Sequence, residues 1–165
     1  MHEMELIGVR VEMPTNAPMV LLRERGGEGR TVPIYIGAPE ATAIALALDG
    51  VTTPRPMTHD LMRDLLEELA VDVERVVVSD LHDKTFFAEI HLRRDGEAHV
   101  VSSRPSDAIA LAARTGTPIF AADSVVDDVG YNELTEAVAD PGQSEEVVEE
   151  FKEFLDTITP EDFED

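Results

Sequence analysis

The chain has 165 residues and no cysteine, which excludes disulfides, thiolate-bound zinc, iron–sulfur clusters and cysteine nucleophiles, so any metal must be held by His, Asp or Glu. Its formal net charge of −22 opposes binding to nucleic acid, because such binding gains affinity from Lys and Arg contacts with phosphates. No apolar run reaches the roughly 18 residues that span a bilayer, and the N-terminus is acidic, so we expect a cytoplasmic protein with no membrane partner.

The first fifty residues predict a three-stranded meander followed by a helix. Residues 4–13 alternate loosely between apolar and polar positions, and apolar runs at 19–22 and 31–36 indicate two more strands. The glycine-rich residues 25–29 are expected to form a hairpin tip, because they lack the lysine and the strand-to-helix setting of a phosphate-binding loop. The helix is expected to begin at Pro39 and to end after Leu48, where an Asp-Gly pair follows.

The residues from Thr58 onward predict a similar succession of strands and helices. Its elements are a helix His59–Leu69 capped by Thr58, strands over 73–79, 85–93 and 97–103, a helix over 105–113 and a short strand from Thr117. The Asp95-Gly96 pair predicts a tight hairpin, which would place His91 and His99 on opposite faces of the sheet. These two imidazoles are therefore not expected to share a metal ion.

A short internal similarity relates the two halves. The sequence Ala-Ile-Ala-Leu-Ala occurs at 43–47 and again at 108–112, in each case after three predicted strands. Duplication of a β-β-β-α unit is one explanation, and a chance match of five alanine-rich residues is the other. In either case, runs of strands interrupted by helices favour an α+β fold with a mainly antiparallel or mixed sheet and packed helices.

The C-terminal part of the chain has a different composition. We place the main domain at residues 1–130 and an acidic extension at 131–165, since residues 115–165 hold 16 acidic side chains and one basic one. Residues 144–158 predict an amphipathic helix with one apolar stripe. That helix could pack on its own domain, bind a partner subunit or remain loosely attached.

Four segments, in this order, resemble the hallmark blocks of the bifunctional nuclease domain family. They are residues 33–37 with Glu40-Ala41, then 55–61, 83–88 and 103–111. The resemblance covers roughly residues 4–130. It implies a compact α+β domain, a tendency to form homo-oligomers and, for some members, an activity that cuts both DNA and RNA.

These blocks contain the residue types that phosphodiester hydrolysis requires. His59 and Asp60 stand in the first turn of a predicted helix, where backbone N–H groups and the helix dipole favour a phosphate. The same residues also form an ordinary helix-capping sequence, in which Asp60 offsets the dipole. Both interpretations stay open from the sequence.

The preferred candidate site lies at the start of the helix over 105–113. Arg104 could bind a phosphate and Asp107 could hold a metal or a water, with Arg55 assisting in substrate binding and Glu40 at the start of the first helix. In the alternative interpretation, Arg104 forms a structural ion pair with Asp107, Asp83 or Glu40.

A divalent metal, Mg²⁺ or Mn²⁺, would have Glu40, Asp83 and Asp107 as its candidate ligands. Asp83 belongs to a group with Asp80 and His82 whose spacing suits a metal, although such residues are also common in strand-to-strand turns.

Two functions follow from these observations. The first is a metal-assisted nuclease acting on DNA and RNA, with His59, Asp60, Asp83, Arg104 and Asp107 as catalytic candidates. The second is a non-enzymatic regulatory or scaffold protein that forms homo-oligomers and binds a protein partner. The strong negative charge favours the second function, and the four family blocks favour the first.

Overall fold

The computed structural model describes residues 1–132, of which Met1–Tyr131 form one compact unit. The elements follow one another as β1 (His2–Glu12), β2 (Ala17–Glu24), β3 (Thr31–Tyr35), α1 (Ala38–Leu48), α2 (Thr58–Glu68), β4 (Asp72–His82), β5 (Thr85–Arg94), β6 (Glu97–Ser103), α3 (Pro105–Thr115), β7 (Ile119–Ala121) and α4 (Asp123–Val129). The predicted α+β class is confirmed. Within residues 1–132, no helix is both long and apolar enough to cross a membrane.

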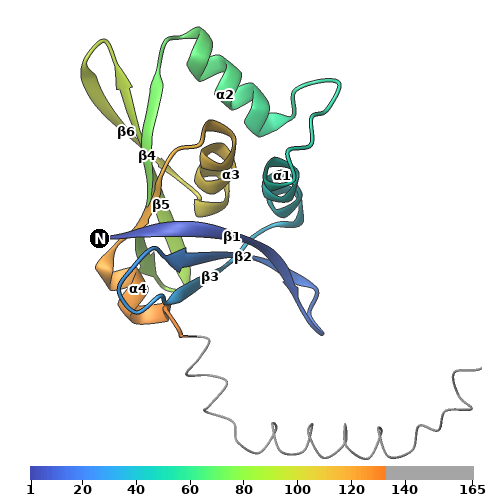
Figure 1. The fold of residues 1–165 in the computed structure, drawn as a ribbon, viewed down its shortest axis with the longest axis vertical. Helices are drawn as coiled ribbons and strands as arrows, with labels where there is room; N and C mark the ends of the chain where they lie inside the picture. The colour runs from blue at the N-terminus through green and yellow to red at the C-terminus, as the bar shows by residue number, and fades with distance from the viewer. Residues whose placement is uncertain (133–165) are drawn as a thin grey trace, which may run out of the picture. The chain divides into compact units, whose positions relative to one another are not determined.

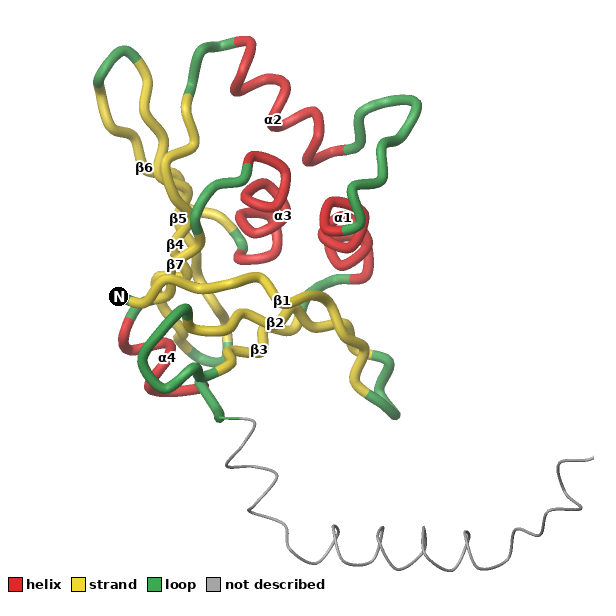
Figure 2. The backbone as a smooth tube through the Cα atoms, viewed as in Figure 1, coloured by secondary structure: helices red, strands yellow, loops and turns green. Residues whose placement is uncertain are grey.

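The strands form one seven-stranded sheet in the order β3-β2-β1-β7-β4-β5-β6, so that two antiparallel meanders lie on either side of the short strand β7 (Figure 2). β7 pairs antiparallel with β1 and parallel with β4, which makes the sheet mixed. A helix follows each meander, α1 after the first and α3 after the second. The arrangement is the one that a duplicated unit would produce, and the duplication itself stays a prediction.

The helices lie on both sides of the sheet. Figure 1 shows α1, α2 and α3 together on one side and α4 on the other. Because the central strand β4 is covered on both sides, Val76, Val77 and Val78 are all buried, in a continuous apolar run rather than an alternating one. The layered arrangement leaves the starts of α1, α2 and α3 near one another at the edge of the core.

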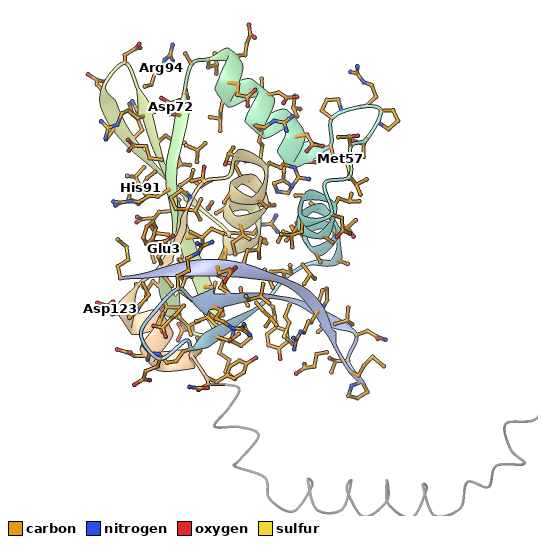
Figure 3. All side chains as sticks on the ribbon, in the orientation of Figure 1. Glu3, Met57, Asp72, His91, Arg94 and Asp123 are labelled. Carbon is orange, nitrogen blue, oxygen red and sulfur yellow. The ribbon has the colours of Figure 1, made fainter. Side chains whose placement is uncertain are left out.

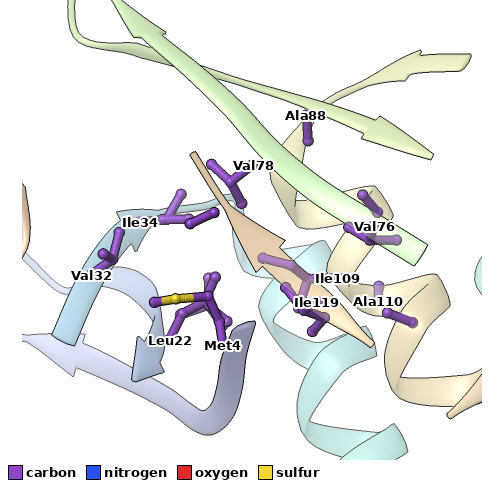
Figure 4. Close-up of a cluster of buried hydrophobic side chains, with 14 of the residues drawn as sticks. Met4, Leu22, Val32, Ile34, Val76, Val78, Ala88, Ile109, Ala110 and Ile119 are labelled. Carbon is purple, nitrogen blue, oxygen red and sulfur yellow. The ribbon is translucent and has the colours of Figure 1, made fainter. Parts of the chain in front are cut away.

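The core joins the two meanders through β7 and α3. Figure 4 shows Met4 and Leu22 of the first meander near Ile119 of β7, with Val76 of the second meander and Ile109 of α3 beyond it. Residues 108–112 of α3 are all almost completely buried. Each large aliphatic side chain buried in this way contributes about 1.5–3 kcal/mol from its removal from water. Helix α3 is therefore held rigidly by the core.

Helix α2 begins one residue earlier than predicted. Met57 is its N-cap, and the carboxylate of Asp60 accepts a hydrogen bond from the Met57 backbone N–H at 3.0 Å. Thr58, the predicted cap, is the first helical residue. The predicted apolar face is divided, because Met62 and Leu66 pack against the core while other leucines of this helix remain exposed.

Residues 1–132 of the structure contain one helix, α4, that the sequence did not predict. α4 was not predicted, because the seven residues Asp123–Val129 carry too few apolar positions to show a helical period. The predicted helix over 144–158 lies outside the described residues.

The hairpin predicted at Asp95-Gly96 is confirmed, since His91 pairs with Val100 and Leu92 with His99.

Candidate functional site

The start of α3 positions two charged side chains. Arg104 is the extended N-cap residue, because the following Pro105 disfavours helical geometry at the position before it and itself suits the first helical position. Asp107 lies in the first turn. The guanidinium of Arg104 donates from Nε to Asp107 Oδ2 at 2.7 Å and from Nη2 to Asp107 Oδ1 at 3.1 Å. The start of α3 thus presents a bidentate Arg–Asp pair.

Helix α2 adds a histidine to this pair. His59 is only 5% exposed, and its Nε2 lies 3.0 Å from Asp107 Oδ1. The two residues are 48 positions apart in the sequence and meet because α2 packs across α3. Asp107 therefore holds a buried imidazole and a guanidinium with the same carboxylate.

Helix α1 supplies the fourth member. Glu40, in the first turn of α1, accepts a hydrogen bond from Arg104 Nη2 at 2.8 Å through its Oε1. Its other oxygen lies against Gly37, in space that a Cβ on that residue would fill. His59, Asp107, Arg104 and Glu40, which we call the Arg104 cluster, therefore join the starts of three helices that neighbour one another in Figure 1.

The charges of the Arg104 cluster stabilise one another. Burial acts to raise the pKa of Asp107, but hydrogen bonds from Arg104 and His59 outweigh it, so the pKa lies below its ordinary value. The same bonds, first from Asp107 and then from Glu40, raise the pKa of Arg104. Arg104 nevertheless keeps 66% of its side chain exposed, against 25% for Asp107 and 7% for His59. The cluster thus presents an exposed cation whose partners are less exposed, and of these His59 is buried.

Asp60, the neighbour of His59, belongs to a different contact. Its carboxylate accepts a hydrogen bond from Arg114 Nε at 2.5 Å, and only 6% of the Arg114 side chain is exposed. Arg114 also donates to the Ala110 carbonyl oxygen. The hydrogen bond from Arg114, followed by the one from the Met57 backbone, lowers the pKa of Asp60. Asp60 therefore joins α2 to the end of α3, away from the Arg104 cluster.

Two other candidates lie apart from the Arg104 cluster. Asp83 is at the exposed β4–β5 turn, where it pairs with His82 at 3.1 Å, and Arg55 is exposed in the loop between α1 and α2. Within residues 1–132, no hydrogen bond or ion pair involves the Arg55 side chain. Figure 3 shows His91 on the side of the sheet away from α1, α2 and α3, where it pairs with Glu89.

The predicted metal ligands do not fit a metal in this arrangement. Both oxygens of Asp107 already accept hydrogen bonds, and the guanidinium of Arg104 bridges Asp107 and Glu40. Asp83 faces solvent in its turn. In the described part of the chain, no group of three His, Asp or Glu residues is placed to hold a metal ion. Of the alternatives left open by the sequence, the contacts match the ion pair of Arg104 with Asp107 and Glu40.

Sequence reasoning missed Arg114, Lys84 and Ser106. Arg114 had one signal, which was a charged residue near the end of a helix otherwise rich in Ala, Ile and Leu. Lys84 and Ser106 lie within the family blocks, directly beside Asp83 and Asp107, but their residue types alone do not indicate a chemical role. Both line a pocket next to Arg104.

Comparisons with known proteins bear on this site. Residues 20–133 match the family described as the bifunctional nuclease domain. An uncharacterized protein of Mycobacterium tuberculosis is 44% identical over 165 residues, which cover 99% of this chain and 98% of that protein. Bifunctional nuclease 2 of Arabidopsis thaliana is 29% identical over 112 residues, and bifunctional nuclease 1 of the same plant is 28% identical over 105. Those stretches are 65% and 62% of this chain but 34% and 32% of the plant proteins.

Proposed function

The chain belongs to the bifunctional nuclease domain family, and from that premise we propose that it hydrolyses phosphodiester bonds of DNA and RNA at the Arg104 cluster. One observation carries the proposal. A single carboxylate, that of Asp107, is hydrogen-bonded both to a buried histidine and to an exposed arginine. The two plant relatives that match this chain are named bifunctional nucleases, which supports the same conclusion.

Each member of the Arg104 cluster has a proposed role. The exposed guanidinium of Arg104 binds the phosphate and stabilises the charge that develops on its oxygens in the transition state. Asp107 fixes the orientation of both partners. With His59 Nε2 donating to Asp107, the other ring nitrogen is the acceptor that can take a proton from the attacking water. Glu40 holds Arg104 from the side of α1.

A metal has no step in this proposal, because Glu40, Asp83 and Asp107 do not fit one as they are arranged. Participation of Mg²⁺ or Mn²⁺ is a question for the cleavage assay. End-labelled single- and double-stranded DNA and RNA should be incubated with the full chain in Mg²⁺, Mn²⁺ or EDTA.

The matched variants for that assay are His59→Ala, Asp107→Ala and Asp64→Ala. Asp64 lies on the same helix as His59, but its side chain is 43% exposed and pairs with Arg63. We expect cleavage to fall roughly a hundredfold or more in the first two variants, which remove proton transfer and its support, and to persist in the third. Equal trace cleavage in all four proteins would mean a contaminating nuclease and would reject the proposal.

A second function has its own supporting observation. Helix α2 exposes three leucines at a spacing of four residues, Leu61, Leu65 and Leu69, each about half exposed. β6 is an edge strand that also exposes Val100 and Val101. Such surfaces suit a homo-oligomeric scaffold protein. If Leu65→Lys lowers the mass of the particle in light scattering, this surface is an interface; an unchanged mass would reject it.

A further inference from the structure

A pocket of about 410 Å³ opens beside the Arg104 cluster. Its lining comes from three separate parts of the chain, which are the β3–α1 junction at 34–37, the β4–β5 turn at 84–86 and the start of α3 at 104–106. Arg104 belongs both to this pocket and to the Arg104 cluster. A ligand in the pocket would therefore lie directly against the guanidinium to which we assign phosphate binding.

The pocket contains a buried hydroxyl that has no protein partner. Ser106 is 6% exposed, yet among residues 1–132 its side chain makes no hydrogen bond, and its hydroxyl is not fully enclosed by protein. Buried polar groups are normally hydrogen-bonded, so an unpartnered hydroxyl that lines a pocket indicates a ligand or water there. Ser106 also stands in the first turn of α3, where backbone N–H groups lack a helical acceptor.

A free cation also lines the pocket. Lys84 follows Asp83 in a two-residue turn in which both residues have positive φ, 49° and 62°. In this geometry, a type I′ turn, the turn residues have fixed positions relative to the flanking strands. No ion pair or hydrogen bond of the Lys84 side chain is found within the described residues. Among the described residues, most other Lys and Arg side chains are paired with carboxylates, so an unpaired lysine beside Arg104 gives this pocket a local preference for anions.

The pocket also has aromatic walls. Tyr35 is 55% exposed, and its hydroxyl donates to Glu12 Oε1 at 2.9 Å, which fixes the orientation of the ring. Phe86 is half-buried and lines the same space. Exposed rings beside cations suit unpaired bases, which stack on aromatic side chains, whereas the bases of a duplex have their faces covered by their neighbours.

We propose that this pocket binds a nucleotide of a single-stranded nucleic acid, with the phosphate on Lys84, Ser106 and Arg104 and the base against Tyr35. The inference rests on the proposed nuclease function, because it identifies the strand as the substrate and names the groups that hold it. The phosphate held by Arg104 in this pocket is then the one at which the strand is cut.

Binding without cleavage provides the test. The anisotropy of a fluorescent 12-nucleotide thymidine oligonucleotide should be measured in EDTA against increasing full-length protein, at several KCl concentrations, and repeated with a duplex of the same length. We expect the single strand to bind more tightly than the duplex. Equal or tighter binding of the duplex would overturn the proposal, and so would displacement of the strand by an equal nucleotide concentration of thymidine monophosphate.

Lys84→Ala and Arg94→Ala form a matched pair of variants, because these cations lie just before the start of β5 and at its end. A phosphate contact on a single strand contributes about −0.7 to the slope of log K against log salt, so Lys84→Ala should reduce the slope by that amount and weaken binding several-fold. Arg94→Ala should change neither. Equal effects of the two variants would reject the pocket. Tyr35→Ala should weaken binding by roughly fivefold or more through lost stacking, with its fold checked by urea unfolding.

The two proposals fail separately. If Lys84-dependent binding is present but no cleavage is found, the nuclease proposal is wrong and the pocket stands. If His59- and Asp107-dependent cleavage is present while Lys84→Ala leaves KM unchanged, the pocket is wrong and the nuclease stands.

Discussion

Each end of helix α3 carries an arginine that pairs with an aspartate, and the two pairs differ in how far the arginine is exposed. At the start, Arg104 pairs with Asp107 and leaves 66% of its side chain exposed. At the end, Arg114 pairs with Asp60 and leaves only 6% exposed. Helix α2 takes part in both pairs, since its His59 contacts Asp107 of the first pair and the adjacent Asp60 belongs to the second.

The difference distinguishes an arginine whose charge stabilises the fold from an arginine whose charge is available to a ligand. A buried arginine must keep its carboxylate, because an unpaired charge in the interior is strongly destabilising. An exposed arginine loses little when its partner is exchanged for a substrate anion, because water solvates it in either state. Substitution of Arg114 should therefore affect stability, and substitution of Arg104 should affect activity.

Arg114→Met should cause the largest loss of stability. The substitution removes a buried donor to Asp60 and to the Ala110 carbonyl oxygen, so the free energy of unfolding should fall by about 3 kcal/mol. Urea unfolding measures this change. The control is Asp64→Asn, whose exposed ion pair should matter by less than about 0.5 kcal/mol. A loss as large in the control would remove the distinction between buried and exposed pairs.

Arg104→Met should instead affect activity. Loss of the guanidinium that stabilises the transition state should reduce kcat/KM for cleavage roughly a hundredfold. The urea midpoint should move much less than in Arg114→Met, because the Arg104 side chain is mostly exposed. If the variant unfolds as readily as Arg114→Met, Arg104 is a structural residue and its assignment to phosphate binding is wrong.

The stability provided by Asp60 should depend on pH. Its pKa in the folded protein is lowered, first by the hydrogen bond from Arg114, so its contribution is fully present above the ordinary value of about 3.9 and is lost as the pH falls through the lower folded value. At pH 7, Asp60→Asn should therefore cost about 1–2 kcal/mol. Urea unfolding from pH 7 to pH 3 should show the difference from the native chain shrinking below about pH 4; a difference independent of pH would contradict this.

Gly37→Ala should have the smallest effect. The backbone of Gly37, with φ −73° and ψ 154°, is accessible to alanine, but the new Cβ would displace the Oε2 of Glu40. Cleavage should change by roughly two- to threefold through the shifted Arg104, and the free energy of unfolding should stay within about 1 kcal/mol. A Glu40→Gln variant with the same kinetics would support this route, whereas a large loss of stability would contradict it.

Local features of the fold could be predicted from the sequence, and its long-range pairings could not. The Asp95-Gly96 turn predicted the register of β5 with β6, and Pro105 predicted the start of α3. In contrast, β7 has only three residues, and its place between β1 and β4 depends on partners 43 positions away in β4 and 115 to 119 positions away in β1. No periodicity within Ile119–Ala121 could indicate that position.

The residues of the candidate site could be predicted from the sequence, but the contacts between them could not. His59, Arg104, Asp107 and Glu40 were singled out by residue type and by their positions at the starts of helices. That His59 would meet Asp107 while its neighbour Asp60 met Arg114 depends on how α2 crosses α3, which the spacing of residues does not specify. Asp83 was grouped with them because it lies in a family block, but its turn places it beside His82.

The position of β7 also determines when this protein can fold. The two meanders have no other strand between them, and the chain reaches β7 only at Ile119, after every residue of the Arg104 cluster has been made. During synthesis, the two meanders therefore cannot pair through β7 until it has been made. Until then, one edge of β1 and one edge of β4 have no partner strand. Such non-local pairing gives a high contact order and slow folding. Chains released before Ala121 should consequently expose two sheet edges and be prone to aggregation.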